Sequence, residues 1–223
     1  DLDPLRAESG VELVMIPPGR PIPGDADIIV LPGSKASIAD MGAIRAQGWD
    51  IDILAHHRRG GAILGICGGY QMLGRTISDP DGVEGPPGAI AGLGLLDVET
   101  VLKPSKVLRR IEGEALGAPF AGYEMHMGET AGPDMTRFFS RLEDGTADGA
   151  MSADGQVMGS YVHGALASSA LRAALLRSLG GVSDGHDHAR LVDGALDEIA
   201  DELERHVDVD ALLELALARE RVG

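Results

Sequence analysis

The sequence has one cysteine among 223 residues, 3% aromatic residues, and 19 basic against 35 acidic side chains. One cysteine cannot form an internal disulfide. A net charge of −16 repels phosphate backbones and anionic lipid surfaces, so we expect neither nucleic acid nor a membrane as partner. There is no charged-then-apolar leader and no apolar run near the roughly 18 residues of a spanning helix, which predicts a cytoplasmic protein.

The chain is rich in apolar residues, which make up 44% of it, and it contains 32 glycines. With few aromatics, small aliphatic residues must fill the core, which suits helices packed closely on a sheet. We predict a three-layer α/β fold with a mostly parallel central sheet, helices on both faces and some antiparallel strands at one side. We expect a single domain over 1–223, with a helical extension of that domain at 181–223. Because the chain does not begin with methionine, we expect a longer parent polypeptide.

The most informative stretch is Ala62–Leu73, which reads as a strand, a sharp turn at Cys67 and a helix. Such a turn lifts a side chain clear of the sheet and places it at a helix N-terminus, where unpaired amides favour a thiolate. A lone cysteine is more often a small buried hydrophobe. However, Gly65, Gly68 and Gly69 would weaken an ordinary core strand, so we predict a reactive thiol.

The letters Gly-Ile-Cys-Gly-Gly-Tyr-Gln at 65–71 fit the pattern Gly-x-Cys-x-Gly-x-Gln. This motif resembles the nucleophile elbow of class I glutamine amidotransferases, domains that release ammonia from glutamine. The resemblance implies that Cys67 is the nucleophile and that Gln71, one turn into the helix, helps to position the substrate.

A second loop follows the apolar run Ile28–Leu31, as Pro-Gly-Ser-Lys. Loops at the carboxyl ends of strands are where open α/β folds bind ligands. From the pattern alone, an ordinary turn with Ser34 as helix N-cap is an equally good interpretation. The resemblance implies that the amides of Gly33 and Gly68 form an oxyanion hole. Each such donor lowers the free energy of the transition state by about 3–4 kcal/mol. The resemblance also implies that Ser34 contacts the substrate.

The segment 122–128, Gly-Tyr-Glu-Met-His-Met-Gly, has strand spacing that puts Glu124 and His126 on one face. On pattern alone, a half-exposed antiparallel strand with a polar face is the better interpretation. It resembles the segment that lines the glutamine pocket in the cobyric acid synthase branch of the family. That resemblance implies that the backbone near Met127 holds the amino-acid end of the substrate.

A histidine ends the strand predicted at 156–163, where a catalytic base could face the thiol. A lone histidine in a strand is more often structural, but the position of His163 resembles that of the family's base. Many class I enzymes carry His-x-Glu, whereas this chain has Ala165 at that place. The site would therefore work as a Cys–His dyad or use Glu124 as the orienting acid.

No metal site is predicted. His56 and His57 are neighbours and do not share a helix face. The His-Asp-His run at 186–188 lacks a third spaced ligand. We expect no cofactor in this domain.

Further patterns predict the remaining elements. Strands are expected at Val11–Ile16 and Leu93–Leu102, with a strand or exposed hairpin at Lys103–Leu116. Helices are expected at Ile51–Arg59, Ser168–Leu179, Ala189–His206 and Val209–Ala218.

The resemblance to the cobyric acid synthase branch covers nearly the whole chain. It implies glutamine as substrate, an N-terminal synthetase domain that uses ATP and magnesium, and a corrinoid that this partner domain amidates in cobalamin biosynthesis. Alternatives within the branch are cobyrinic acid a,c-diamide synthase and the glutaminase of peptidoglycan-precursor amidation. Outside it, the chain could be a silent module that braces a partner, or another cysteine hydrolase, against which Gln71 argues.

Overall fold

The computed structural model describes residues 1–220, with the backbone alone at 106 and 218–220. The chain divides into two compact units, the first covering Asp1–His186 and the second beginning at Asp187. This boundary falls inside the segment 181–223 that we expected to extend a single domain.

The first unit contains both helices and strands. Its helices are α1 (Asp3–Arg6), α2 (Ser37–Ala46), α3 (Trp49–Arg58), α4 (Gly68–Leu73) and α5 (Ser169–Ser178), with 3₁₀ turns η1 (Pro133–Thr136) and η2 (Ala165–Ala167). Its strands are β1 (Ile28–Leu31), β2 (Ala62–Ile66), β3 (Thr76–Asp79), β4 (Gly88–Ala91), β5 (Glu99–Ala115), β6 (Ala118–Ala131), β7 (Ser140–Leu142), β8 (Ala147–Asp148), β9 (Ala150–Met151), β10 (Val157–Ser160) and β11 (Val162–His163).

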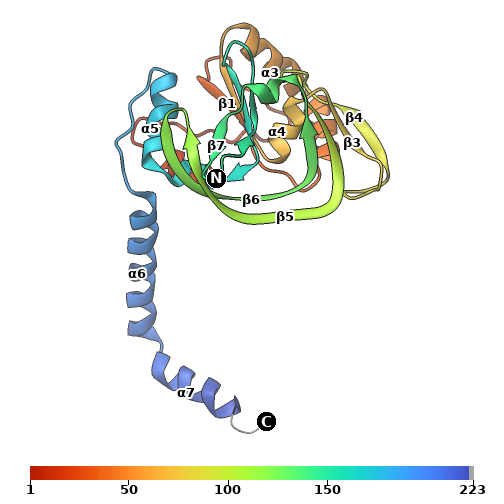
Figure 1. The fold of residues 1–223 in the computed structure, drawn as a ribbon. Helices are drawn as coiled ribbons and strands as arrows, with labels where there is room; N and C mark the ends of the chain where they lie inside the picture. Colours follow the sequence, from red (N-terminus) through yellow and green to blue (C-terminus); the bar gives the residue numbers. More distant parts are fainter. Residues whose placement is uncertain (221–223) are drawn as a thin grey trace. The chain divides into compact units, whose positions relative to one another are not determined.

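One sheet has the order β1-β2-β10-β9, in which β1, β2 and β10 run parallel and β9 is antiparallel. Its register pairs Leu31 with Gly65 and Ser160 with Ile66, so the parallel strands end at the same edge. Helix α5 lies to one side of β1 and α4 to the other (Figure 1). The predicted α/β layering is therefore confirmed.

The second sheet is mainly antiparallel, with the order β11-β6-β5-β3-β4 and with β7 and β8 attached beside β5. Strands β5 and β6 form a long curved ribbon below the first sheet (Figure 1). Leu102 and Ile111 of β5 are buried whereas Leu108 is exposed, as expected for a sheet with one wet face. The antiparallel strands thus form a sheet of their own, larger than the few edge strands that we predicted.

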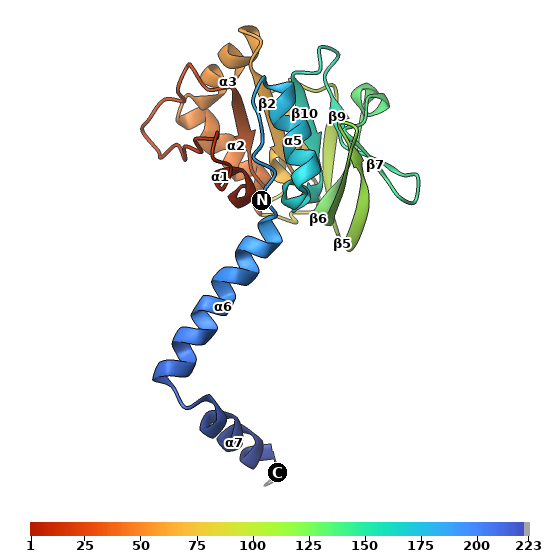
Figure 2. The ribbon, with the colours of Figure 1, turned by 90° about the vertical axis from the view of Figure 1, so that its left-hand side faces the viewer.

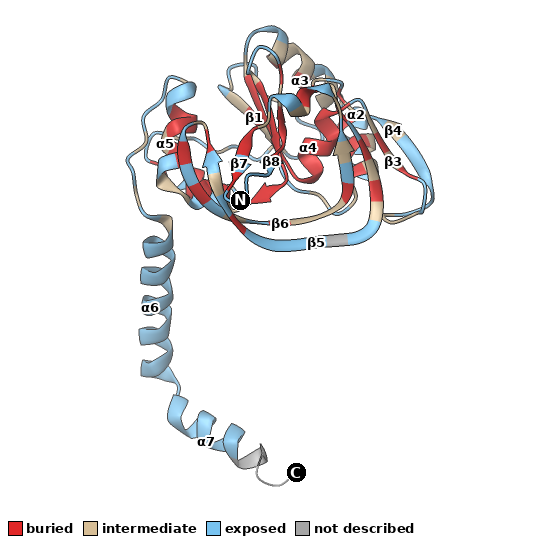
Figure 3. Ribbon diagram, viewed as in Figure 1, coloured by how far each residue is buried: buried red, intermediate tan, exposed pale blue. Residues whose placement is uncertain are grey.

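The core consists of small aliphatic side chains between the sheets and helices, and the central strands and α4 are its most buried parts (Figure 3). Arg172 on α5 is also fully buried. Its guanidinium donates to the Glu8 carboxylate at 2.8 Å and to the carbonyls of Leu166 and Ala167. Because both charges are paired and hydrogen-bonded, this ion pair ties the N-terminal segment to α5.

Two expected strands are absent or shortened. Val11–Ile16 is irregular, with Val14 and Met15 exposed, because no strand among the described residues pairs with it. The strand expected from Leu93 begins at Glu99, because the amides of Leu93 and Leu95 donate to carbonyls at the end of α4.

The second unit contains α6 (His188–His206) and α7 (Val209–Glu220), close to the predicted bounds. The Asp187 carboxylate caps α6 by accepting from the amides of Ala189 and Arg190. Figure 2 shows the chain bending between the two helices. Within residues 1–220, no helix combines the length and apolar character that crossing a lipid bilayer requires.

Candidate active site

Cys67 occupies the turn between β2 and α4. Its backbone has φ 51° and ψ −109°, a conformation that a non-glycine residue adopts only under strain of about 1–3 kcal/mol. The surrounding structure holds it there, because all six residues of α4 are buried. This is the strand–turn–helix geometry predicted for a nucleophile elbow.

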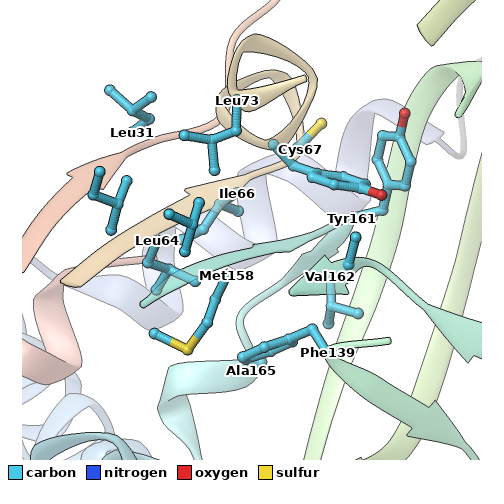
Figure 4. Packing of buried hydrophobic residues seen from close by; sticks show 14 of the residues in the cluster. Leu31, Leu64, Ile66, Cys67, Leu73, Phe139, Met158, Tyr161, Val162 and Ala165 are labelled. Carbon is cyan, nitrogen blue, oxygen red and sulfur yellow. The ribbon is translucent and has the colours of Figure 1, made fainter. Parts of the chain in front are cut away.

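The thiol itself is nearly enclosed, with Cys67 only 6% exposed. Its sulfur lies 3.6 Å from the Met125 carbonyl oxygen on β6, and its amide donates to the Ser160 carbonyl at 2.8 Å. Figure 4 shows the sulfur pointing away from the packed side chains of Leu64 and Met158. Cys67 therefore lies at the border of the core and faces the β5–β6 ribbon.

Three segments meet at the carboxyl edge of the parallel strands. Gly33 follows β1 by two residues, Cys67 follows β2 directly, and His163 ends β11, just after β10. Since β1, β2 and β10 are parallel and in register, these positions gather where open α/β folds hold ligands.

Close contacts join the three segments. A Cβ added at Gly33 would lie 2.8 Å from Cε1 of His163, and one added at Gly68 would lie 2.7 Å from Cβ of Ser34. Only glycine fits at either place without movement of its neighbour. Among the described residues, no carbonyl pairs with the amides of Gly33 or Gly68. The two predicted oxyanion donors, Gly33 in the loop after β1 and Gly68 at the start of α4, thus lie beside the histidine and the cysteine.

His163 is buried, and its Nδ1 lies 2.9 Å from a carboxylate oxygen of Asp1. The other oxygen of Asp1 accepts from the Gly164 amide at 2.7 Å. The ring also stacks on Tyr123, with centroids 5.3 Å apart. Sequence reasoning missed Asp1, because nothing in a local pattern connects positions 162 apart.

Glu124, the orienting acid in one of the two arrangements that the sequence left open, is engaged elsewhere. Its carboxylate is buried and accepts from Nε of Arg109 at 2.5 Å, across the β5–β6 pair. This hydrogen bond raises the pKa of Arg109. The structure therefore places the Asp1 carboxylate, and not that of Glu124, on His163.

Gln71 and Ser34, two of the predicted substrate-binding residues, make different hydrogen bonds within the protein. Gln71 is buried, accepts from the Ser37 hydroxyl at 2.7 Å and donates to the Met127 carbonyl at 3.4 Å. It thereby ties α4 to α2 and β6. The Ser34 hydroxyl accepts from the Ala36 amide and does not cap α2.

Glu84 is a second residue that sequence reasoning missed. Its carboxylate accepts from the Ser37 amide at the start of α2, at 2.6 Å. The Asp79 carboxylate holds the preceding turn through the amides of Val83 and Glu84. Burial raises the pKa of Glu84. The loop after β3 is thus fastened beside the Ser37–Gln71 hydrogen bond.

Near the thiol lies a polar cluster in which Thr100 and Tyr161 are buried and Thr130 and His126 are half-buried. The Tyr161 hydroxyl is within 2.6 Å of the Thr130 hydroxyl, which in turn is 2.6 Å from that of Thr100. His126 stacks on the Tyr161 ring at 3.8 Å, and burial lowers the pKa of His126. The cluster holds β6 in place behind Met125.

Potential metal ligands are already bound to protein. Among the described residues, one group could hold an ion: Glu8, Asp184 and His186. The Glu8 carboxylate accepts from Arg172 and from the Ser183 hydroxyl. This group therefore belongs to the packing of α5.

A cavity of about 540 Å³ lies along β5 and β7. Its walls include Phe138, Arg141 and Leu142, and neither Cys67 nor His163 lines it. It is separate from the cysteine site.

Comparison with known proteins gives concordant results. Residues 1–171 match the model of the CobB/CobQ-like glutamine amidotransferase domain family. Among curated proteins, the chain is 68% identical over 218 residues to a protein of Rhizorhabdus wittichii named cobyric acid synthase. It is 61% identical over 218 residues to one of the same name from Novosphingobium aromaticivorans. These matches cover 98% of this chain but 45% and 44% of the relatives, so the chain spans less than half of their length.

A solved structure described as a glutamine amidotransferase shares the fold. It superimposes with a TM-score of 0.51 at 20% sequence identity, covering 69% of this chain and 79% of the other.

Proposed function

The chain belongs to the CobB/CobQ-like glutamine amidotransferase domain family, and on this premise we propose that it hydrolyses glutamine through a cysteinyl thioester at Cys67 and releases ammonia. Family membership confirms the resemblance inferred from the motif at 65–71. The observation that supports the chemistry is the meeting of the Gly33 loop, the Cys67 elbow and His163 at one sheet edge.

The first half of the proposed reaction uses the thiolate as nucleophile. Cys67 attacks the side-chain amide carbon of glutamine, and the amides of Gly33 and Gly68 stabilise the oxyanion that forms. His163 then gives its proton to the amide nitrogen as the carbon–nitrogen bond breaks. Ammonia leaves and the γ-glutamyl thioester remains.

The second half regenerates the thiol. His163, now neutral, removes a proton from water as the oxygen attacks the thioester carbon. Collapse of this second tetrahedral intermediate breaks the carbon–sulfur bond, releases glutamate and restores Cys67. Gln71 contributes indirectly by holding the Met127 carbonyl, where we propose that the amino-acid end of glutamine binds, with Ser34 beside the oxyanion donors.

The ammonia needs an acceptor, since free ammonia is protonated in water. Curated relatives at 56–68% identity are named cobyric acid synthase. We propose that a synthetase domain, absent from this chain, activates corrinoid carboxylates with ATP and magnesium and amidates them. No cofactor is required by the chemistry of this chain itself.

A glutaminase assay tests the proposal for this chain. Glutamate release is measured for the parent, for Cys67→Ala and for His57→Gln, a control histidine on α3 that pairs with Asp154. We expect Cys67→Ala to abolish release and His57→Gln to retain it. Release that survives in Cys67→Ala would contradict the thioester route.

The acceptor is tested in the polypeptide that carries this chain. Incubation with glutamine, ATP, magnesium and corrinoid acids should yield amidated corrinoid by mass spectrometry, and Cys67→Ala should need added ammonia. Amidation only of the a and c carboxylates would point to the diamide synthase alternative.

A further inference from the structure

We propose that Asp1 is the positioning residue for His163, so that the site works as a Cys67–His163–Asp1 set. This inference rests on the proposed glutaminase reaction. Many class I enzymes carry a glutamate two residues after the histidine, where this chain has Ala165. The Asp1 carboxylate, 162 positions before His163, stands in its place.

The contact is bidentate. One oxygen of Asp1 is 2.9 Å from Nδ1 of His163, and the other accepts from the Gly164 amide at 2.7 Å. Both oxygens are therefore satisfied by the residue that Asp1 orients and by its neighbour. Such a carboxylate restrains both the ring and the backbone that carries it.

The carboxylate also selects the ring tautomer. An ionised carboxylate only accepts hydrogen bonds, so Nδ1 of His163 must carry the hydrogen. Nε2 is then the nitrogen free to exchange protons with sulfur, ammonia and water. Tyr123 and Gly33 confine the ring by contact but cannot choose between its tautomers.

The pair is sheltered from water. The side chains of His163 and Asp1 are 10% and 19% exposed, so their attraction is screened less than that of a surface pair. This attraction stabilises the imidazolium that accompanies the thiolate. Among the described residues, no other carboxylate contacts His163, since Glu124 pairs with Arg109.

The segment that carries Asp1 is itself anchored. The Leu2 carbonyl accepts from the amides of Leu5 and Arg6, Leu5 is buried, and Glu8 pairs with the buried Arg172. Arg172 also binds the carbonyls of η2, the turn that follows His163. The histidine and its carboxylate are thus fixed to one support.

Kinetics of three variants test the inference in the polypeptide that carries this chain, so that Asp1 keeps its native neighbour. We expect Asp1→Asn to lower kcat on the order of 100-fold with little change in KM, because proton transfer and not binding is impaired. Asp1→Glu should recover part of the loss. Glu124→Gln, the matched control, should leave kcat unchanged.

A spectroscopic readout separates positioning from folding. In Cys67→Ala at alkaline pH, nitrogen NMR should find the hydrogen of His163 on Nδ1, and adding Asp1→Asn should shift it toward Nε2. An unchanged kcat or an unchanged tautomer in Asp1→Asn would overturn the role of Asp1. Glutaminase activity that survives in Cys67→Ala would instead overturn the proposed reaction and leave the tautomer result to stand by itself.

Discussion

The edge of the parallel sheet and the β5–β6 ribbon both border the thiol, yet they supply different things. The segments that follow the parallel strands bring Gly33, Cys67 and His163 together. The ribbon supplies the backbone carbonyls of Met125 and Met127, while the Glu124 carboxylate on it pairs with Arg109. The comparison teaches that a titratable residue beside a reactive group need not take part in its chemistry.

The largest expected difference in kcat is between replacing His163 at the sheet edge and replacing His126 on the ribbon. His163→Gln should lower kcat for glutamine hydrolysis by about 10²- to 10⁴-fold, because it removes the general acid and base. His126→Gln should stay near the parent rate, since His126 stacks on Tyr161 near the thiol. Equal losses in the two variants would remove the distinction between the regions.

Adding one methyl group at Gly68, the first residue of α4, tests how closely this residue packs at the sheet edge. Gly68→Ala would place Cβ 2.7 Å from Cβ of Ser34, so we expect a stability loss of about 1–3 kcal/mol. We also expect turnover to fall on the order of 100-fold, because the donor amide moves. Urea unfolding and the glutaminase assay measure the two effects.

Gly42→Ala on α2 is the matched control, because nothing lies within 4 Å of its added Cβ. It should stabilise the protein by about 0.5–1 kcal/mol through helix propensity and leave turnover unchanged. Loss of activity in this variant would show that glycine substitution in general, and not the fit to Ser34, is harmful.

On the ribbon, the Glu124–Arg109 pair should matter for stability only. Arg109 is 43% exposed, so solvent screens the pair and Glu124→Gln should cost no more than about 1 kcal/mol. Glutamine turnover should be that of the parent. A fall in kcat with unchanged stability would restore Glu124 as an orienting acid.

The smallest expected effect is a pH dependence from His126. Burial lowers its pKa below the ordinary 6.5, so at pH values just below 6.5 the unfolded chain binds more protons than the folded one. Stability should therefore fall as the pH decreases from 6.5 toward the lowered pKa. Urea unfolding of the parent and of His126→Gln across this range measures the difference, and identical slopes would exclude it.

Much of the cysteine site could be predicted from local patterns. The elbow at Cys67 could be predicted because an apolar strand, the glycines and a helix follow one another within twelve residues. Each of these signals affects only the backbone next to it. The bounds of α5, α6 and α7 agree with prediction because helix periodicity and caps are also local signals. The strand expected at Val11–Ile16 was wrong, because a strand depends on a partner that its own letters do not specify.

By itself, the sequence determined the family and the elbow at Cys67, and it predicted Cys67 and His163 as the catalytic pair, since motif and spacing act over short distances. Only the tertiary structure decided which carboxylate reaches His163. Asp1 and Glu124 carry the same kind of group, and nothing near either one in the chain tells them apart. Packing chose between them, because Arg109 lies across the ribbon from Glu124 while α1 and the buried Glu8–Arg172 pair hold Asp1 against the imidazole.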